Sequence, residues 1–483
     1  MSDLGNGYCP IQLDQYLPLL VISLVAREGA GGGQRGVCPS LRTLRFGHSP
    51  VHGVSSRPSN SERERERIRN LTQRTFADSL MISPRMQAFM AAWAAACHST
   101  GDVRLVVSKG TYLLGPVSFR GPCRFVSSLT FQGYLKATTN LGSYRDSWVE
   151  FGWVNRLILT GGIFDGQGAS AWPHNTCPKN WNCKLLPTSI KFVSMTNTTV
   201  KGITSLNSKF FHVALVGCKG FRGSGIRISA PANSPNTDGI HIEQSQDVTI
   251  QQSSVSTGDD CISIGQGNSR ITISGITCGP GHGISSVGSL GKYAYEKDVR
   301  GLVVRNSILS GTANGVRIKT WANSPGAIVA ANMTFENIVM NNVANPIIID
   351  QLYCPYASCA SSVPSLVRIS DISFKNIRGT SATPVAVMLR CSHGTPCKNV
   401  RLQDVHLDHP GRLRSSSTCM NIKAIYSGTQ IPLPVAFRER NCEGAGRRWC
   451  SAEHGSHLLL GRGFPPAFCV FSLTAVYGFL SRK

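Results

Sequence analysis

One short pattern of apolar residues recurs along the middle of the chain and restricts the possible folds more than any other feature. The pattern is apolar-x-apolar-x-x-Ile/Val, with Ser in the last place in two copies, and successive clear copies start roughly 23 to 40 residues apart. Alternating apolar residues indicate strands, and a repeat of this length indicates a solenoid whose coils stack their strands. An ordinary β-sandwich does not need the same pattern nine times, so we predict an all-β chain that forms a parallel β-helix. The clear copies begin at Val248, Ile271, Leu302, Met333, Ile372 and Val400, and the weaker ones at Leu157, Thr198 and Phe221.

The two ends of the chain differ from this repeat region. Residues 1–85 contain a small glycine-rich run and an alternating Glu-Arg run, which predict an atypical N-terminal extension that is disordered. Apolar residues at helical spacing between Met86 and Cys97 predict a short N-terminal cap helix packed on the first coil. We therefore expect the β-helix domain over residues 86–430 and an atypical C-terminal tail over residues 431–483.

The charge of the chain points to a polyanionic partner. The formal net charge is +23, and residues 86–430 alone hold 31 Lys and Arg against 16 Asp and Glu. Nucleic acids, anionic membranes and acidic polysaccharides all suit such a surface. The sequence shows no zinc-finger spacing, RNP-type motif or basic recognition helix, which argues against nucleic acid. Proline and glycine break the apolar stretch near the C-terminus, so we expect no membrane span.

Seventeen cysteines are many for a cytosolic protein. Without a Cys-x-x-Cys pair to indicate a zinc site, they predict disulfides and an oxidising compartment, hence a secreted protein. Leu17–Ala26 has the length of a signal-peptide core, but the residues before it include Asp3 and Asp14 and no Lys or Arg. Three pairs lie close in sequence: Cys177 with Cys183, Cys354 with Cys359, and Cys391 with Cys397.

Polar residues interrupt the repeat at equal spacing. Asp259 and Asp260 follow Gly258 in a segment of small and apolar residues. Asp238 lies 22 residues before Asp260, and His282 lies 22 residues after it. Residues one coil apart should have the same angular position on the solenoid, with their side chains about 5 Å apart. Because neighbouring residues of a strand point to opposite faces, Asp259 and Asp260 can reach the same side only if the backbone turns at Gly258.

These residue types together suit the hydrolysis of an acidic sugar chain. Clustered carboxylates raise at least one pKa, which gives an acid beside an ionised base. Inverting glycoside hydrolysis uses such a pair at about 6.5–9.5 Å, a separation that deeper loops could provide. Arg317 and Lys319 follow one coil later on one face of a strand, where they suit a sugar carboxylate. Taken singly, an Asp-Asp pair is more often a solvated turn and a lone His more often structural. Their common register favours a site.

The motifs resemble the polygalacturonase family of glycoside hydrolases, over about Met86 to Gln430. The segments Gly288–Lys292 and Asn345–Gln351 are most similar to plant, pollen-type exopolygalacturonases. The resemblance implies a right-handed parallel β-helix that hydrolyses α-1,4 bonds between galacturonic acids with inversion. We expect a secreted, monomeric, exo-acting enzyme of the cell wall that needs no cofactor or metal. The matching motifs are Asn236-Thr237-Asp238, Gly258-Asp259-Asp260, Gly281-His282-Gly283 and Arg317-Ile318-Lys319.

The resemblance also implies a role for each site residue. Asp259 matches the general acid, and His282 matches a residue that supports the protonation state of that acid. Asp238 and Asp260 match the pair that activates water. The residues implied in substrate binding are Asn236, Arg317, Lys319 and Tyr353, of which Arg317 and Lys319 match the cations for a sugar carboxylate and Tyr353 a tyrosine of the cleft.

The sequence departs from the family pattern in three places. Residues 1–85 do not resemble the usual opening segment, and Val435 stands where a closing cysteine is expected, which would leave Cys419 unpaired. The run after His282 is one residue longer than usual, near Ser285 and Ser286. Such an insertion flips the rest of a strand unless a β-bulge absorbs it. These departures leave open an inactive or misfolded family member. A hydrolase of xylogalacturonan or rhamnogalacturonan, or a calcium-dependent pectate lyase, would be alternative enzymes.

Overall fold

The computed structural model shows two compact units built from parallel β-strands. Unit 1 takes the chain up to Asn175 with residues 184–213 and 221–227, and unit 2 takes residues 176–183, 214–220 and the chain from Ile228. The described residues are 8–12, 22–27, 84–99, 101–177, 179–180, 182–355, 363–411 and 414–434.

Unit 1 begins with an antiparallel pair of strands and a helix. Strand β1 (Tyr8–Gln12) pairs with β2 (Ile22–Arg27), and β2 also runs antiparallel to β3 (Val103–Val107). Both β1 and β2 belong to the predicted N-terminal extension. The rest of residues 1–83 and the chain after residue 434 lie outside the described residues, so the extension and the tail stay predictions.

Helix α2 (Pro84–His98) lies where the apolar spacing predicts a cap helix. It buries Phe89 and Trp93 against the first strands, and the Trp93 indole N–H donates to the carbonyl of Arg120 at 2.9 Å. The predicted face is only partly correct, because Met90 is 36% exposed and Ala94 is exposed. Small residues fill the buried face instead, which lets the helix approach the strands closely.

The coils of unit 1 form two parallel sheets. In one sheet β6 pairs with β3, β4 and β8, and β8 pairs with β10 and β11, while β5, β7 and β9 form the other. Between the sheets Phe119, Phe151 and Phe192 stack with ring centroids 5.1 and 5.3 Å apart. The remaining strands of unit 1 are β4 (Thr111–Leu114), β5 (Val117–Arg120), β6 (Val126–Ala137), β7 (Ser147–Gly152), β8 (Ile158–Asp165), β9 (Thr188–Val193), β10 (Thr199–Lys201) and β11 (Thr204–Leu206), with 3-10 turns at Leu141–Ser143, Gly168–Ser170 and Trp172–His174.

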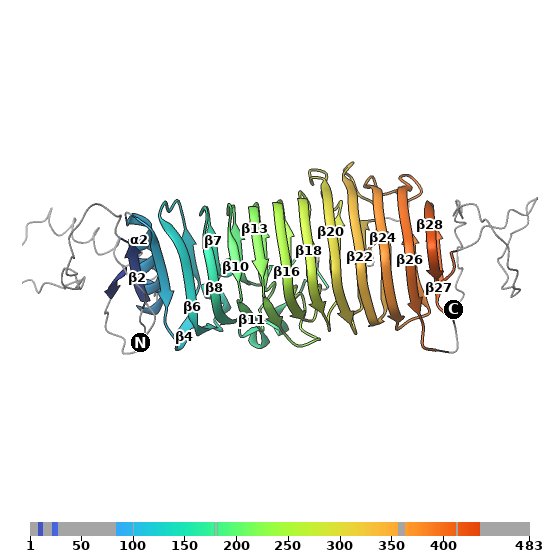
Figure 1. The fold of residues 1–483 in the computed structure, drawn as a ribbon. Coiled ribbons are helices and arrows are strands. Elements are labelled where there is room, and N and C mark those ends of the chain that lie inside the picture. The colour runs from blue at the N-terminus through green and yellow to red at the C-terminus, as the bar shows by residue number, and fades with distance from the viewer. Residues whose placement is uncertain are drawn as a thin grey trace, which may run out of the picture. The chain divides into compact units, whose positions relative to one another are not determined.

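Unit 2 also consists of two parallel sheets, and Figure 1 shows its longer strands side by side. Strands β12 (Val213–Val216), β13 (Lys219–Ser224) and β14 (Arg227–Ser229) contain residues of both units. Sheet A of unit 2 consists of β16 (Gln246–Ser256), β18 (Ser269–Cys278), β20 (Val299–Ser310), β22 (Val329–Val343), β24 (Arg368–Ser381), β26 (Cys397–Asp408) and β28 (Ile422–Ile431). Sheet B of unit 2 consists of β15 (Ile240–Glu243), β17 (Ile262–Ile264), β19 (Ile284–Leu290), β21 (Asn314–Trp321), β23 (Asn345–Tyr353), β25 (Val385–Arg390) and β27 (Ser416–Met420).

Equivalent positions of the sequence repeat pair with one another in successive strands of sheet A. The six clear copies begin at residues that pair directly in successive strands, and their second apolar positions pair in the same way. All of these side chains are buried, so each coil adds one apolar layer to the core. The predicted parallel solenoid is therefore confirmed. The first register column is Val248, Ile271, Leu302, Met333, Ile372 and Val400.

The asparagines that follow the repeat bend three strands within sheet A. Asn306, Asn337 and Asn376 have φ of 53°, 55° and 49°, in the left-handed region that asparagine tolerates. Asn337 donates to the amide oxygen of Asn306 at 3.2 Å and accepts from Asn376 at 2.8 Å. The three side chains form a ladder that fixes the same corner on three coils.

The extra residue after His282 is absorbed as a β-bulge. Ile262 pairs with Ile284 and Ser263 with Ser286, so Ser285 has no opposite residue in β17. Strand β21 skips Ser285 in the same way. Because the bulge restores the register, the inward-facing positions of β19 stay buried after it.

The disulfides agree with the predicted oxidised state. Cys177 bonds to Cys183 and Cys391 to Cys397, as expected from their spacing. The prediction that Cys419 is unpaired was wrong, because this residue is disulfide-bonded although Val435 occupies the expected cysteine position. A different cysteine therefore supplies the second sulfur. Two further disulfides, Cys97–Cys123 and Cys261–Cys278, join α2 to the first coil of unit 1 and β18 to the turn before β17.

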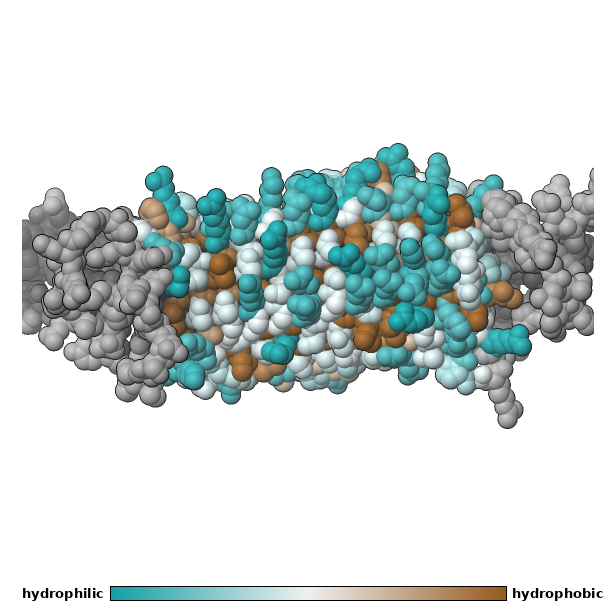
Figure 2. All heavy atoms as spheres, viewed as in Figure 1, coloured by the Kyte–Doolittle hydropathy of each residue, from teal (hydrophilic) through white to brown (hydrophobic). Residues whose placement is uncertain are grey.

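The outer face of sheet A is basic. Figure 2 shows hydrophilic side chains gathered over β20 to β26, with apolar patches between them. Among the described residues no helix has the length and apolar character that crossing a membrane requires. The exposed cations of these strands are Arg300, Arg305, Arg368, Lys375, Arg378, Lys398 and Arg401.

Candidate functional site

The evenly spaced polar residues lie on three consecutive coils of unit 2, just before strands β15, β17 and β19. The Gly239 N–H donates to the Asp260 carbonyl at 2.9 Å, and the His282 N–H donates to the Asp259 carbonyl at 2.8 Å. Ile240, Ile262 and Ile284, which begin the three strands, pair in sequence. The spacing of 22 residues therefore places Asp238, the Asp pair and His282 in one column.

The backbone bends at Gly258 and Asp259, as the sequence requires if both carboxylates are to face one side. Glycine is needed here for close packing, because a Cβ atom at Gly258 would lie 2.1 Å from the carbonyl oxygen of Ser234. The buried Thr237 hydroxyl accepts from the Gly258 N–H at 3.1 Å. The Asn-Thr-Asp-Gly motif thus positions the bend of the next coil as well as its own carboxylate.

Each of the two adjacent carboxylates has its own cationic partner. Asp259 lies 3.0 Å from His282 Nδ1, and the Asp260 carboxylate lies 3.2 Å from the ammonium of Lys319. Asn236 donates its amide N–H to Asp259 at 3.3 Å. The Asp260 side chain is only 4% exposed, whereas that of His282 is 47% exposed. The column is therefore buried at Asp260 and accessible at His282.

The surroundings separate the pKa values of the site. Burial, followed by the charges of Asp259 and Asp260, raises the pKa of Asp238 well above its usual range. Burial alone would raise the pKa of Asp259, but the hydrogen bond and charge of His282 outweigh it and lower that pKa. The same hydrogen bond raises the pKa of His282. The site thus favours the neutral form of Asp238, and it favours a charged Asp259 beside a protonated His282.

Asp259, Asp260 and His282 offer three possible metal ligands within 4.8 Å of one another. The ammonium of Lys319 already lies against Asp260 and is buried with it, so a metal ion there would meet a fixed positive charge. The donor set therefore fits a water or a protonated sugar oxygen better than a cation. One oxygen of Asp260, Oδ1, is buried without a hydrogen-bond partner among the described residues.

Arg317 and Lys319 lie on the outer face of β21, with the ring of Tyr353 against both. The guanidinium carbon of Arg317 is 5.2 Å from the ring centroid, and the Lys319 ammonium is 5.5 Å from it. Tyr353 reaches this face through an irregularity in β23, where Lys319 pairs with Asp350 but Trp321 pairs with Tyr353. The extra residue in β23 turns the tyrosine outward.

Two polar neighbours of the column were missed in the sequence. Asp350 lies 4.0 Å from Arg317 and opposite Lys319, and Ser263 is hydrogen-bonded to Asp238. The coil length gives a signal for the first of these, because Leu302 and Met333 are 31 residues apart and so are Lys319 and Asp350. No comparable motif marks Ser263, which continues an ordinary apolar strand.

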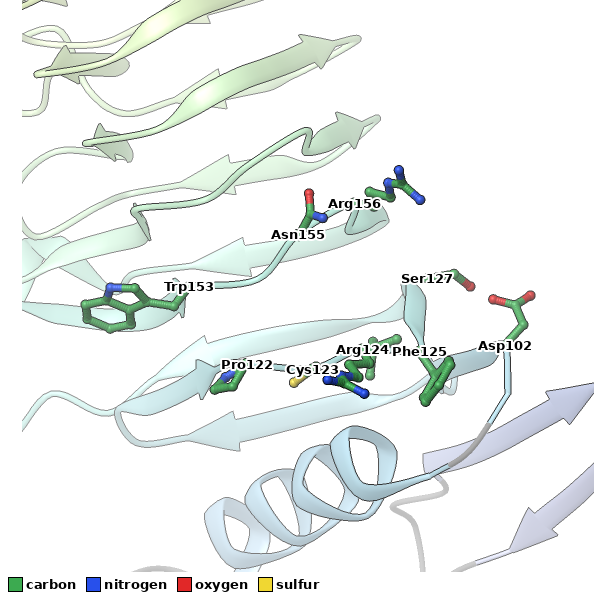
Figure 3. A pocket seen from close by; sticks show the side chains of 10 residues that line it. Asp102, Pro122, Cys123, Arg124, Phe125, Ser127, Trp153, Asn155 and Arg156 are labelled. Carbon is green, nitrogen blue, oxygen red and sulfur yellow. The ribbon is translucent and has the colours of Figure 1, made fainter.

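A separate hollow of about 470 Å³ lies in unit 1, between the turn after β5 and the turn after β7 (Figure 3). Arg124, Phe125 and Arg156 line it, and Asp102 is its one carboxylate. Trp153 points away from the other labelled side chains in this view. The hollow lacks the second carboxyl group that glycoside hydrolysis uses, so the column in unit 2 is the candidate active site.

Residues 97–430 match the family model described as glycosyl hydrolases family 28. The chain belongs to this family. The resemblance seen in the four motifs is thereby confirmed, and with it an enzyme that hydrolyses O-glycosyl bonds. An exopolygalacturonase from Platanus acerifolia is 46% identical over 351 residues, which cover 72% of this chain and 92% of the relative. An exopolygalacturonase from Zea mays is 44% identical over 346 residues, covering 71% and 84%.

Solved structures show the fold of the family 28 chain. The endo-xylogalacturonan hydrolase from Aspergillus tubingensis matches with a TM-score of 0.61 at 22% identity, over 72% of this chain and 98% of that one. An exopolygalacturonase from Thermotoga maritima matches with a TM-score of 0.57 at 18% identity, over 70% and 86%. These matches agree with the strand pairing described above. The predicted right-handed parallel β-helix is confirmed.

Proposed function

We propose that this family 28 enzyme hydrolyses the α-1,4 bonds of polygalacturonate and acts from a chain end. The observation that carries the proposal is the contact between the carboxylate column and two cations, in which Lys319 touches Asp260 and lies beside Arg317 over Tyr353. This combination suits a sugar that carries its own carboxylate. The exopolygalacturonases among its relatives favour exo action.

In this proposal Asp259 and His282 together supply the acid. The leaving sugar oxygen needs a proton as its bond to the anomeric carbon breaks. Asp259 alone is a poor acid in the free enzyme because its pKa is lowered. The His282 Nδ1–H donates to Asp259 across 3.0 Å, so the pair still holds a proton that Asp259 can pass to the oxygen. His282 is therefore a positioning residue that keeps a proton available to Asp259.

Asp260 and Asp238 hold the attacking water. The unpartnered oxygen of Asp260 is the acceptor, while the ammonium of Lys319 pairs with the same carboxylate at 3.2 Å. The raised pKa of Asp238 leaves a neutral carboxyl group that can orient the same water. The water gives its proton to Asp260 while its oxygen bonds to the anomeric carbon. A sugar carboxylate bound to Arg317 fixes the ring for this attack.

We propose inversion at the anomeric carbon, as the family resemblance implies. The nearest ligand atoms of Asp259 and Asp260 lie within 4.8 Å, which is shorter than the about 6.5–9.5 Å usual for inverting pairs. The wider separation was expected for carboxylates on neighbouring coils, such as Asp238 and Asp259, and it stays a prediction. Inversion here rests on the water being held between Asp238 and Asp260, and NMR of the first product formed would show its anomeric configuration.

The same proposal covers the setting of the enzyme. We propose a secreted cell-wall protein that acts as a monomer on pectin, with its catalytic domain in residues 86–430. Its disulfides and the basic outer face of sheet A support this setting. A member inactivated by misfolding is disfavoured, because the bulge at Ser285 preserves the register around His282.

Purified protein incubated with polygalacturonate at acidic pH should release galacturonate monomers and new reducing ends. Asp259→Asn should lower kcat by about 10³-fold or more, because the amide cannot transfer a proton. Asp408→Asn, an exposed carboxylate at the end of β26, is the matched control and should keep full activity. A folded wild-type protein without activity would refute the proposal, and mixed oligomers as first products would refute exo action.

A chelator should leave the rate unchanged, whereas a pectate lyase would lose activity and yield unsaturated products.

A further inference from the structure

A loop beside the catalytic column carries side chains that the proposed mechanism does not use. It connects β19 to β20, and the carboxylate of Glu296 closes it by accepting the N–H groups of Gly291 at 2.7 Å and Tyr293 at 3.0 Å. The Lys297 N–H donates to the side chain of Gln266 at 3.0 Å, which ties the loop to the preceding coil. These bonds give the loop a fixed shape and direction.

The loop holds Lys292 over two aromatic rings. Its ammonium lies 5.2 Å from the ring centroid of Tyr293 and 5.9 Å from that of Trp321. Aromatic faces attract a cation, and an ammonium group has three N–H donors to direct at an anion. Tyr295 stacks on Tyr293 at 5.6 Å, and these two rings are 80% and 44% exposed. The loop therefore presents a positioned cation beside accessible rings.

Trp321 connects this loop to the cations of the candidate active site. Arg317, Lys319 and Trp321 are alternate residues of β21 and so share its outer face. Trp321 meets the ring of Tyr353 edge to face, with centroids 6.0 Å apart. Along the strand it lies about 6.6 Å from Lys319, two residues at the usual rise. A continuous surface of rings and cations thus extends from Asp260 to the loop.

We propose that Lys292, with Tyr293 and Trp321, binds a second galacturonate unit beside the one held by Arg317 and Lys319. The inference rests on the proposed function and adds to it a second position that recognises charge. The carboxylate of the second unit accepts hydrogen bonds from the Lys292 ammonium, and a face of its sugar ring packs on an aromatic ring. A substrate chain with an uncharged sugar at this position loses the contact, so the enzyme recognises two neighbouring carboxylates of its substrate.

The test compares substrates that differ by one unit. Digalacturonate fills the two positions at the bond that is cut, one of which Arg317 and Lys319 hold. Trigalacturonate adds a third unit next to that one, and Lys292 would bind it. In Lys292→Gln the ratio of kcat/KM for trigalacturonate to that for digalacturonate should fall about tenfold. Lys297→Gln, which removes an exposed lysine of the same loop, should leave this ratio unchanged. Lys292→Arg should restore most of it.

An unchanged ratio in folded Lys292→Gln would overturn the inference. If Lys292→Gln does not fold, Tyr293→Leu replaces it, because loss of the ring that positions the ammonium should lower the same ratio. If wild-type protein cleaves neither substrate, the proposed function fails, and calorimetry then decides this inference separately. Trigalacturonate should bind about tenfold more weakly to Lys292→Gln than to the wild type, and equal affinities would refute the second position.

Discussion

In the proposed mechanism Asp259 and His282 hold one proton between them, and this predicts the sign of the pH dependence. The pKa of His282 is raised, so the pair is protonated below this pKa and loses its proton as the pH rises through it. The acid is then lost, and activity should fall on the alkaline side. The hydrogen bond of the pair also stabilises the fold. The contribution through His282 is complete below about 6.5, the ordinary pKa of histidine, and disappears as the pH rises past the raised pKa, while the contribution through Asp259 is lost as the pH falls through the lowered pKa of that carboxyl group.

Replacing His282 with Gln should move the alkaline limb of the pH–kcat profile to lower pH. Without the imidazole, Asp259 alone must hold the proton, and carboxyl groups release protons at lower pH than imidazoles. The profile of kcat on trigalacturonate between pH 3.5 and 8 measures the shift. His406→Gln, at an exposed histidine on β26, is the control. A profile of unchanged shape with a uniformly lower kcat would mean that His282 only supports the structure.

The positions of the column residues could be predicted from their spacing, but their partners could not. Two steps of 22 residues placed Asp238, Asp260 and His282 on adjacent coils because each coil advances by one turn of the solenoid. The pairing of Lys319 with Asp260, 59 residues apart, depends on where the long lysine side chain points, which the coil spacing does not give. Tyr353 faces the site because of an irregular residue in β23, and strand alternation alone would turn it inward.

At the level of elements, the asparagine ladder keeps the same bend in successive strands although the coils differ in length. Three successive strands of sheet A bend at a residue in the left-handed conformation, which Asn306, Asn337 and Asn376 provide. The ladder fixes the corner, so loops beyond it can vary without disturbing the strands. The sequence shows the asparagines after the apolar pattern but not their side-chain bonds, which require the stacked coils.

Asn337→Val should destabilise the protein by about 2–3 kcal/mol. The change forces a β-branched residue into the left-handed region, at a cost of about 1–2 kcal/mol, and removes two exposed hydrogen bonds. Asn337→Gly also removes these bonds but adopts the conformation freely, so it should lose about 1 kcal/mol. Urea unfolding of the three proteins gives the comparison. If valine is tolerated as well as glycine, the backbone conformation does not limit stability at this corner.

At the scale of the whole chain, the positive charge exceeds what the catalytic column needs. In the proposed mechanism Arg317 and Lys319 bind one uronate, yet the formal net charge is +23 and the outer face of sheet A carries a series of exposed cations. A positively charged surface attracts a polyanion over distances of about the Debye length, which is roughly 10 Å at 0.1 M salt and 3 Å at 1 M. The outer cations should therefore raise the local concentration of long polygalacturonate chains more than that of short oligomers.

Salt should consequently raise KM for long polygalacturonate several-fold more than KM for trigalacturonate, with little effect on kcat. A variant with Arg305, Lys375 and Arg401 of sheet A changed to Gln tests the source of this difference, because all three are exposed and lie outside the catalytic column. It should bind the long substrate more weakly at 0.05 M salt and show a flatter dependence of KM on salt, while its KM for trigalacturonate stays that of the wild type. Equal salt dependence in the variant and the wild type would assign the whole effect to Arg317, Lys319 and their neighbours on sheet B. The outer face would then have no part in capturing the polymer.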